Sequence, residues 1–285
     1  YNIWQFDPRA TKEPVNLTVN GRKEMITYRL VKLDKEERDI SLNKRQILIG
    51  FNEKSKGYGY YRAQFSKAAV PSVLMAGNYM LKSPLKAKKS DAVLYTVETF
   101  QQYPDLHLSD LDFAKGIKLT NGVAQQEGFN WGTAELVHWI SLDGRPLEGV
   151  VYKPADFDPA KKYPMIVNFY ERNAETLYGY RMPEPHRSTI DYHYYTSNGY
   201  LVFNPDVRYK DGYPGESCYN SIMPGISALI AQGYVDEKAI GAQGHSWGGY
   251  QVAYLATRTN LFAAIESGAP VVNMFSAYGG IRWGT

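Results

Sequence analysis

The amino-acid sequence predicts an α/β domain that is preceded by an all-β region. Over residues 1–130, short segments rich in β-branched and aromatic residues recur with turns between them and no helical stripe, which is typical of antiparallel strands. From residue 131 onward, nearly continuous apolar runs alternate with helical segments. That alternation indicates strands buried on both faces of a largely parallel sheet.

The all-β region has eight predicted strands. They span residues 24–34, 45–52, 58–66, 72–77, 78–83, 92–100, 105–110 and 116–121. Two charged segments, 32–45 and 82–91, are interpreted as solvated loops. Neither has the interleaved aromatic residues that stack on nucleic-acid bases. The region therefore predicts a β-rich module with no nucleic-acid partner.

The α/β region, residues 131–285, begins with a strand pair over 133–141 and 146–154, joined by an Asp-Gly hairpin signal. Four buried strands follow, at 163–171, 199–206, 237–245 and 262–270. Helices are predicted over 224–233, with Pro224 in the first turn and Gly233 as the C-terminal cap, and over 248–259. We place the boundary between the two regions within residues 122–133.

Composition and motif content argue against several kinds of partner and cofactor. A formal net charge of +3 over 285 residues is too small to argue for nucleic acid or an anionic membrane as a partner. No apolar run reaches the roughly 18 residues that a membrane span needs. The single cysteine, Cys218, cannot form an internal disulfide and is interpreted as a packed side chain. No dinucleotide fingerprint or metal-ligand spacing occurs, so neither a cofactor nor a metal is predicted.

The strongest motif is Gly-His-Ser-Trp-Gly at residues 244–248, which has the G-x-S-x-G pattern of a serine nucleophile on a sharp strand-to-helix turn. Its context fits, because a buried strand precedes Ser246 and a helical segment follows it. Glycines at 244 and 248 let strand and helix pass close together. A serine at the start of a helix also has free N–H groups nearby that can stabilise an oxyanion. The alternative is a glycine-rich turn without catalytic function.

A second oxyanion donor is expected on the loop after the first buried strand, where the sequence reads Val-Asn-Phe-Tyr-Glu-Arg. Backbone amides there could serve. Tyr170 is the side-chain candidate because a phenol hydroxyl is a good donor to an oxyanion. The plainer interpretation is one more tyrosine at a strand end.

The segments GHSWGGYQ, ALIAQGYVDEKAIGAQ and NFYERNAET resemble the prolyl oligopeptidase family of serine peptidases, nearest to its dipeptidyl peptidase and acylaminoacyl peptidase branches. The resemblance implies an α/β-hydrolase domain preceded by the last blades of a β-propeller, and a peptide substrate. It also implies that Ser246 is the nucleophile. The Trp247 backbone N–H and the Tyr170 hydroxyl would be the oxyanion donors.

The base and the acid of a catalytic triad are missing after Ser246, where that fold places them. Only one carboxylate, Glu266, and no histidine follow the serine. The five histidines precede or adjoin it and are interpreted as packing or surface residues: His107, His138, His186, His193 and His245. We therefore expect a fragment cut at both ends, with about three propeller blades, a triad aspartate and histidine after residue 285, and no activity on its own.

Two other functions stay open at this stage. The serine turn by itself also fits an esterase-like hydrolase. The missing base and acid also fit a non-catalytic binding protein built from a propeller and a hydrolase-like domain. The sequence does not separate proline-directed, dipeptidyl and acylaminoacyl cleavage, and it leaves compartment and oligomeric state open.

Overall fold

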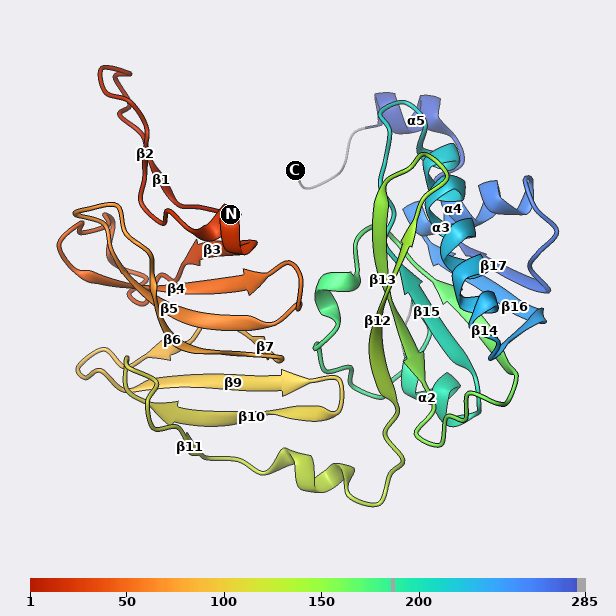
Figure 1. Cartoon of the computed structure of the whole chain (residues 1–285), viewed down its shortest axis with the longest axis horizontal. Helices are drawn as coiled ribbons and strands as arrows, with labels where there is room; N and C mark the ends of the chain where they lie inside the picture. Colours follow the sequence, from red (N-terminus) through yellow and green to blue (C-terminus); the bar gives the residue numbers. More distant parts are fainter. Residues whose placement is uncertain (186–187, 281–285) are drawn as a thin grey trace. The chain divides into compact units, whose positions relative to one another are not determined.

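A computed structural model describes residues 1–185 and 188–280 of the chain. It contains two compact units (Figure 1). The first unit consists of residues 1–128 together with 178–180, and the second of residues 129–177 together with 181–285. Each unit is described by itself.

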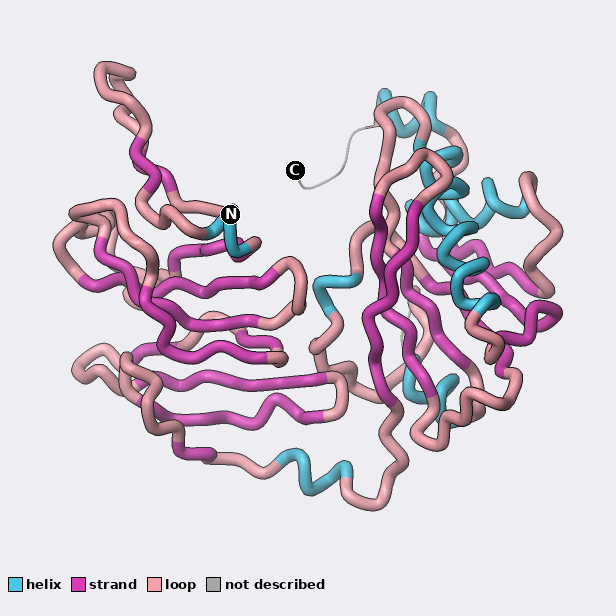
Figure 2. Tube along the Cα trace, in the orientation of Figure 1, coloured by secondary structure: helices cyan, strands magenta, loops and turns pink. Residues whose placement is uncertain are grey.

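The first unit is built almost entirely from antiparallel strands (Figure 2). Its elements are β1 (Trp4–Gln5), β2 (Val15–Asn16), α1 (Gly21–Glu24), β3 (Ile26–Leu30), β4 (Arg45–Asn52), β5 (Tyr58–Gln64), β6 (Ser72–Gly77), β7 (Met80–Leu81), β8 (Leu85–Lys86), β9 (Val93–Thr99), β10 (Gln102–Ser109), β11 (Ile117–Lys118) and the 3₁₀ helix η1 (Gly122–Gln126). All eight predicted strands are confirmed. The sequence missed β1, β2, β8 and α1, which are two to four residues long and too short to show a period.

Two sheets share the main core of this unit. Strands β3-β4-β5-β6 form one sheet, and β11-β10-β9-β7, with β8 beside β9, form the other. Tyr60 of β5 is fully buried, and its ring lies 4.4 Å from that of Phe113 and 6.1 Å from that of Tyr95 of β9, between centroids. The Tyr60 hydroxyl donates to the carbonyl of Lys82 at 2.5 Å. Aromatic side chains therefore fill this core while their hydroxyls find polar partners.

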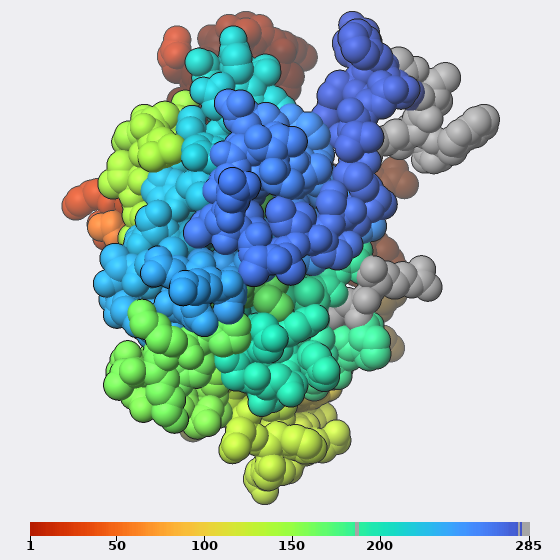
Figure 3. Space-filling view, turned by 90° about the vertical axis from the view of Figure 1, so that its right-hand side faces the viewer, coloured from red at the N-terminus to blue at the C-terminus, as the bar shows by residue number. Residues whose placement is uncertain are grey.

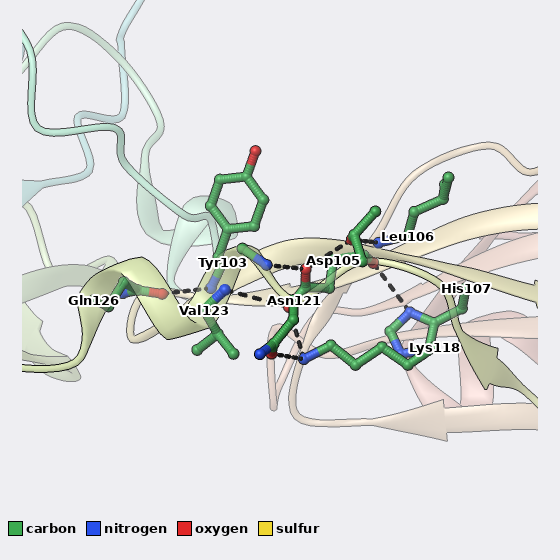
Figure 4. Close-up of polar contacts among 10 residues, drawn as sticks. Tyr103, Asp105, Leu106, His107, Lys118, Asn121, Val123 and Gln126 are labelled. Atoms are coloured by element: carbon green, nitrogen blue, oxygen red, sulfur yellow. Dashed lines mark hydrogen bonds and ion pairs between the residues drawn. The ribbon is translucent and has the colours of Figure 1, made fainter.

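A buried carboxylate ties β10 to the segment that leaves the unit (Figure 4). Asp105 is fully buried and accepts hydrogen bonds from Thr120 (2.7 Å) and from the backbone N–H of Gly122 (2.6 Å). It also pairs with Lys118 Nζ at 2.8 Å. Burial by itself would raise the pKa of Asp105, but these donors outweigh burial and hold the pKa well below its usual range. The carboxylate thus anchors residues 118–123 to the sheet.

The second unit has a six-stranded sheet covered by helices. Its elements are β12 (Thr133–Ile140), β13 (Pro146–Lys153), β14 (Tyr163–Asn168), the 3₁₀ helix η2 (Ala174–Thr176), α2 (Tyr192–Ser197), β15 (Leu201–Pro205), α3 (Pro214–Ala231), β16 (Val235–His245), α4 (Trp247–Ala256), β17 (Ala264–Gly268) and α5 (Met274–Gly279). The strand order is β12-β13-β15-β14-β16-β17. The last four strands in this order are parallel, and β12 and β13 are antiparallel to their neighbours. The predicted α/β domain with a largely parallel sheet is confirmed, but the fourth strand, predicted to be buried, is exposed over residues 264–266 because β17 is the edge strand of the sheet.

The core of this unit lies between the sheet and helices α3 and α4. Apolar residues from the parallel strands, among them Met165, Phe203 and Ile240, are fully buried against Ile222 and Leu255 of those helices. Cys218 also belongs to this core, and burial raises the pKa of its thiol. It is a packed cysteine.

One helix boundary was predicted wrongly. The sequence placed a helix over 224–233, whereas α3 begins at Pro214 and continues through Pro224 to Ala231. A proline inside a helix removes the hydrogen bond to the carbonyl four residues earlier, here that of Asn220. In the fold that carbonyl accepts the backbone N–H of Leu142 at 3.0 Å instead. A partner from the β12–β13 hairpin therefore satisfies the group that Pro224 leaves free.

The hairpin itself follows its signal: β12 and β13 pair in continuous antiparallel register, and Gly144 takes a φ of +78° in the turn between them. Elsewhere in this unit the surface is hollowed between residues 188–195 and strands β14, β16 and β17, around a cavity of about 650 Å³. Figure 3 shows this side, with the 188–200 segment in teal and the 261–270 segment in blue. Among the described residues, no helix is both long enough and apolar enough to span a membrane.

Candidate active site

Ser246 lies at the turn between β16 and α4, where its backbone has φ 58° and ψ −112°. A positive φ is strained for any residue with a side chain, and such strain persists only when surrounding contacts enforce it. The Ser246 N–H donates to the carbonyl of Gly268 at 2.8 Å, which fixes the turn against the end of β17. The Ser246 hydroxyl makes no hydrogen bond with the residues described.

Three glycines around Ser246 allow this close packing. A Cβ on Gly244 would lie 2.4 Å from the carbonyl carbon of Gly248, and a Cβ on Gly248 would lie 2.7 Å from the carbonyl oxygen of Phe169. A Cβ on Gly249 would lie 2.6 Å from the carbonyl oxygen of Gly268. Side chains at these positions would collide with backbone, so the strand, the helix and the β14 loop approach each other only because all three are glycine.

The Trp247 N–H lies in the first turn of α4, where backbone donors have no intrahelical partner. Tyr170 follows the end of β14 and is 46% exposed. Its ring carbon Cδ2 lies 3.7 Å from the position of a Cβ on Gly248, so the ring stands at the N-terminal end of α4. The fold thus brings together the three residues that the sequence singled out, Ser246, Trp247 and Tyr170, around one helix start.

A buried hydrogen-bond network holds the Tyr170 backbone in place. Gln251 of α4 is fully buried and donates from Nε2 to the Tyr170 carbonyl at 2.8 Å. The Tyr209 hydroxyl lies 3.2 Å from that carbonyl and 3.1 Å from Gln251 Oε1, and it accepts from Trp247 Nε1 at 3.1 Å. Burial raises the pKa of Tyr209, so its hydroxyl keeps its proton. We call these residues the Tyr209–Gln251 network.

A buried carboxylate holds the other side of the same loop. Asp206, at the end of β15, accepts the backbone N–H groups of Asn173 (2.5 Å) and Ala174 (2.9 Å). Burial raises the pKa of Asp206, and these two N–H groups act in the opposite direction. The loop from Tyr170 to Ala174 is therefore fixed at both ends.

Sequence reasoning missed Asp206, Tyr209 and Gln251. They belong to no motif, and their partners lie 32 to 81 residues away along the chain. Only the packing of α4 against the β14 and β15 loops brings them into contact.

None of the described histidines hydrogen-bonds Ser246. His107 stacks on Tyr95 in the first unit, and His138 is an exposed residue of β12. His193 is engaged by the carbonyl of Arg181 through Nε2 at 2.9 Å, and burial lowers its pKa. His245 has Nδ1 3.1 Å from the position of a Cβ on Gly268. His186 lies outside the described residues.

Glu266, the one carboxylate after the serine, is an exposed residue of β17. Its Oε1 lies 2.9 Å from the position of a Cβ on Gly268, and it has no hydrogen bond to a described histidine. The described part of the chain therefore places Ser246 beside Tyr170 and the Trp247 N–H and shows no base in contact with the serine.

Comparison with known proteins agrees with this geometry. Residues 188–283 match the model of the prolyl oligopeptidase family. The chain is 24% identical over 157 residues to the uncharacterized peptidase YuxL of Bacillus subtilis, a match that covers 51% of this chain and 23% of that protein. It is 28% identical over 153 residues to dipeptidyl peptidase 8 of Mus musculus, covering 48% of this chain and 17% of that protein.

Solved structures show the same fold. Dipeptidyl peptidase 4 of Porphyromonas gingivalis superposes with a TM-score of 0.66 at 17% identity, over 95% of this chain and 38% of that one. A putative dipeptidyl aminopeptidase IV of Bacteroides ovatus superposes with a TM-score of 0.64 at 20% identity, over 92% of this chain and 37% of that one. The second unit has the α/β-hydrolase fold, and the matches cover less than a quarter of these curated relatives. The part of the chain that carries the serine turn, residues 188–283, is thus similar to the prolyl oligopeptidase family of serine peptidases.

Proposed function

We propose that the protein containing this chain is a serine peptidase and that Ser246 is its nucleophile. The observation that carries the proposal is the backbone of Ser246, a non-glycine residue at φ 58° between a buried strand and a helix start. Strain of this kind is found where a side chain must be presented in one orientation. The family match over residues 188–283 and the peptidases among the relatives support it.

In the proposed reaction, Ser246 Oγ bonds to the carbonyl carbon of the scissile peptide and its proton passes to a base. The Trp247 N–H and the Tyr170 hydroxyl donate to the oxyanion that forms. The C–N bond then breaks, the proton goes to the leaving amine, and water hydrolyses the acyl-enzyme. We propose that a histidine outside the described residues supplies the base, because no described histidine contacts Ser246.

We also propose that residues 1–130 are part of a β-propeller. A four-stranded meander, β3-β4-β5-β6, and a neighbouring antiparallel sheet that share one aromatic core have the form of adjacent blades. A structure of the protein expressed from its complete gene tests this. Sheets closed in a ring would support it, and an open sandwich would overturn it.

The nucleophile is tested with a fluorophosphonate probe on the protein expressed from its complete gene. We expect one label on Ser246, located by peptide mass spectrometry, and loss of both label and peptide hydrolysis in Ser246→Ala. Ser267→Ala is the matched control, because Ser267 on β17 hydrogen-bonds the carbonyl of Gly249 and is not a proposed nucleophile. Hydrolysis that survives in Ser246→Ala would reject the proposal.

A further inference from the structure

A second cavity lies beside the serine turn, within the α/β unit. Its volume is about 240 Å³, and its lining includes Tyr170, His245, Arg181, Asn173, Asn204 and Thr189. Two of these residues border the proposed nucleophile. His245 directly precedes Ser246, and Tyr170 stands at the start of the helix that Ser246 begins. A group bound in this cavity would therefore lie close to a peptide held at the serine.

Arg181 is the charged residue of this cavity. Its guanidinium carbon lies 4.1 Å from the ring centroid of Tyr192 and 5.5 Å from that of Tyr152. These aromatic contacts fix the plane of the guanidinium. The cation keeps its charge in any environment at neutral pH, because an arginine side chain is not deprotonated in proteins. The cavity thus holds a fixed positive charge.

Arg181 has no acidic partner among the described residues. Its Nε is buried and has no hydrogen-bond partner in the part of the chain that the structure describes. Nor does any described carboxylate form an ion pair with it, and no acidic residue is among those that line the cavity. A buried donor without an acceptor costs free energy, and few remain in native proteins.

Asn204 has a buried acceptor that likewise has no hydrogen-bond partner in the described part of the chain. Its Nδ2 donates to the Tyr192 hydroxyl at 2.6 Å, whereas its Oδ1 is buried and has no partner among the described residues. Both atoms are buried, so the part of Arg181 that a ligand can meet is the rest of the guanidinium that lines the cavity. A carboxylate matches this charge, since a guanidinium binds carboxylates through two parallel hydrogen bonds.

We propose that this cavity, the Arg181 pocket, binds a substrate carboxylate close to the scissile bond. The proposal rests on the peptidase function proposed above and assigns it a substrate class: short peptides that carry either a free C-terminal carboxylate or an acidic side chain near the cleaved bond. The volume supports this class. Pockets for drug-sized ligands start at roughly 300 Å³, and about 240 Å³ is room for the end of one residue.

The test uses the protein expressed from its complete gene and a library of short peptides, each made as the free acid and as the C-terminal amide. Cleavage is followed by mass spectrometry. A second arm replaces Asp or Glu by Asn or Gln in amidated peptides, which separates the two sources of carboxylate. We expect Arg181→Gln to lower kcat/KM for the carboxylate substrates by roughly 10- to 100-fold, mainly through KM, and to leave the amides unchanged.

Two further variants make the result specific. Arg181→Lys keeps the charge and loses the planar fork, so an intermediate kcat/KM is expected. Arg208→Gln removes an exposed arginine outside the pocket and should leave the acid-to-amide ratio at the wild-type value. If Arg181→Gln does not fold, the same comparison is made with Arg181→Lys alone. An equal loss for acids and amides, or no loss for either, would overturn the proposal.

The proposed function and the pocket can fail separately. Fluorophosphonate labelling of Ser246 needs no carboxylate, so Arg181→Gln should label as the wild type does. Binding of N-acetyl dipeptides and their amides to Ser246→Ala, measured by calorimetry, reports on the pocket without any turnover. Preference for the acid that disappears on adding Arg181→Gln supports the pocket even if Ser246 proves not to be the nucleophile. Equal binding both of acid and amide and of amidated peptides with Glu or Gln refutes it.

Discussion

The backbone conformation of Ser246 determines how its hydroxyl is presented. The serine is held at a positive φ by a hydrogen bond to Gly268 and by glycines that allow backbone to pass at close range. Its hydroxyl has no partner in the described residues. A strained, unpaired hydroxyl at a helix start is the arrangement that a nucleophile requires.

At the same scale, we predict that Tyr170→Phe lowers kcat by roughly 10²- to 10³-fold with little change in KM, because an oxyanion donor acts mainly in the transition state. Steady-state kinetics on the protein expressed from its complete gene measure this. Tyr194→Phe, on an exposed tyrosine of α2, is the matched control. Unchanged turnover in Tyr170→Phe would mean that the hydroxyl has another role.

The Tyr209–Gln251 network gives a second prediction about residues. Gln251→Leu removes the 2.8 Å hydrogen bond to the Tyr170 carbonyl and leaves the proposed oxyanion hydroxyl present but loosely positioned. We expect kcat to fall by about tenfold, the cost of roughly one hydrogen bond. Because both changes act on one donor, Tyr170→Phe and Gln251→Leu together should cost less than the product of their separate effects.

Gln125→Leu, an exposed position, controls for the glutamine-to-leucine change itself. A double variant whose loss equals the product of the single losses would show that Gln251 does not act through Tyr170.

At the scale of elements, a few buried polar groups join strands to neighbouring loops. Asp206 fastens the loop after β14 to the end of β15, and Asp105 fastens residues 118–123 to β10. Each carboxylate accepts backbone N–H groups that no strand or helix partner satisfies. Loops with such anchors keep one conformation although they lack regular structure.

Asp105 yields a stability prediction for this scale. Asp105→Asn loses the ion pair with Lys118 and should lower the free energy of unfolding of the first unit by about 1–3 kcal/mol, a range set by a partner that is itself partly exposed. Denaturant unfolding followed by circular dichroism measures it. Asp91→Asn removes an exposed carboxylate that pairs with Lys86 and should cost under about 1 kcal/mol.

The contribution of Asp105 to stability depends on pH in a definite direction. The folded-state pKa of Asp105 lies below its unfolded value of about 3.9. Its contribution to stability is therefore complete above that unfolded value and is lost as the pH falls toward the folded pKa. Wild type should lose stability below about pH 4 more steeply than Asp105→Asn. If the free energy of unfolding falls equally with pH in both proteins, the Asp105 carboxylate does not cause the loss.

At the scale of the whole molecule, the proposed nucleophile has no base beside it among the described residues. The described residues bring the proposed nucleophile and the proposed oxyanion donors together and place no histidine against the serine hydroxyl. We therefore predict that the 285-residue chain alone does not hydrolyse peptides that the protein from the complete gene cleaves. Turnover by purified chain is the measurement, with its Ser246→Ala variant as the background. Activity that this variant abolishes would show that a base lies within these residues.

The sequence predicted the larger features because they depend on local patterns. The β-rich first region, the buried parallel strands and the serine turn all follow from side-chain period, glycine placement and turn chemistry within about ten residues. The error at α3 has the same origin. Pro224 looks like a helix start when only its neighbours are considered, and the Leu142 N–H that relieves its missing hydrogen bond lies far away in the chain.

By itself, then, the sequence determined the order of strands and helices, the position of Ser246 and the candidacy of Tyr170 and Trp247. Only the tertiary structure decided what surrounds them: the Tyr209–Gln251 network, the Asp206 anchor and the Arg181 pocket. The physical reason is the range of the interactions. Hydrogen bonds and cation–aromatic contacts act over a few ångströms, and Gln251 meets Tyr170 across 81 residues of chain only after the strands and helices between them have packed.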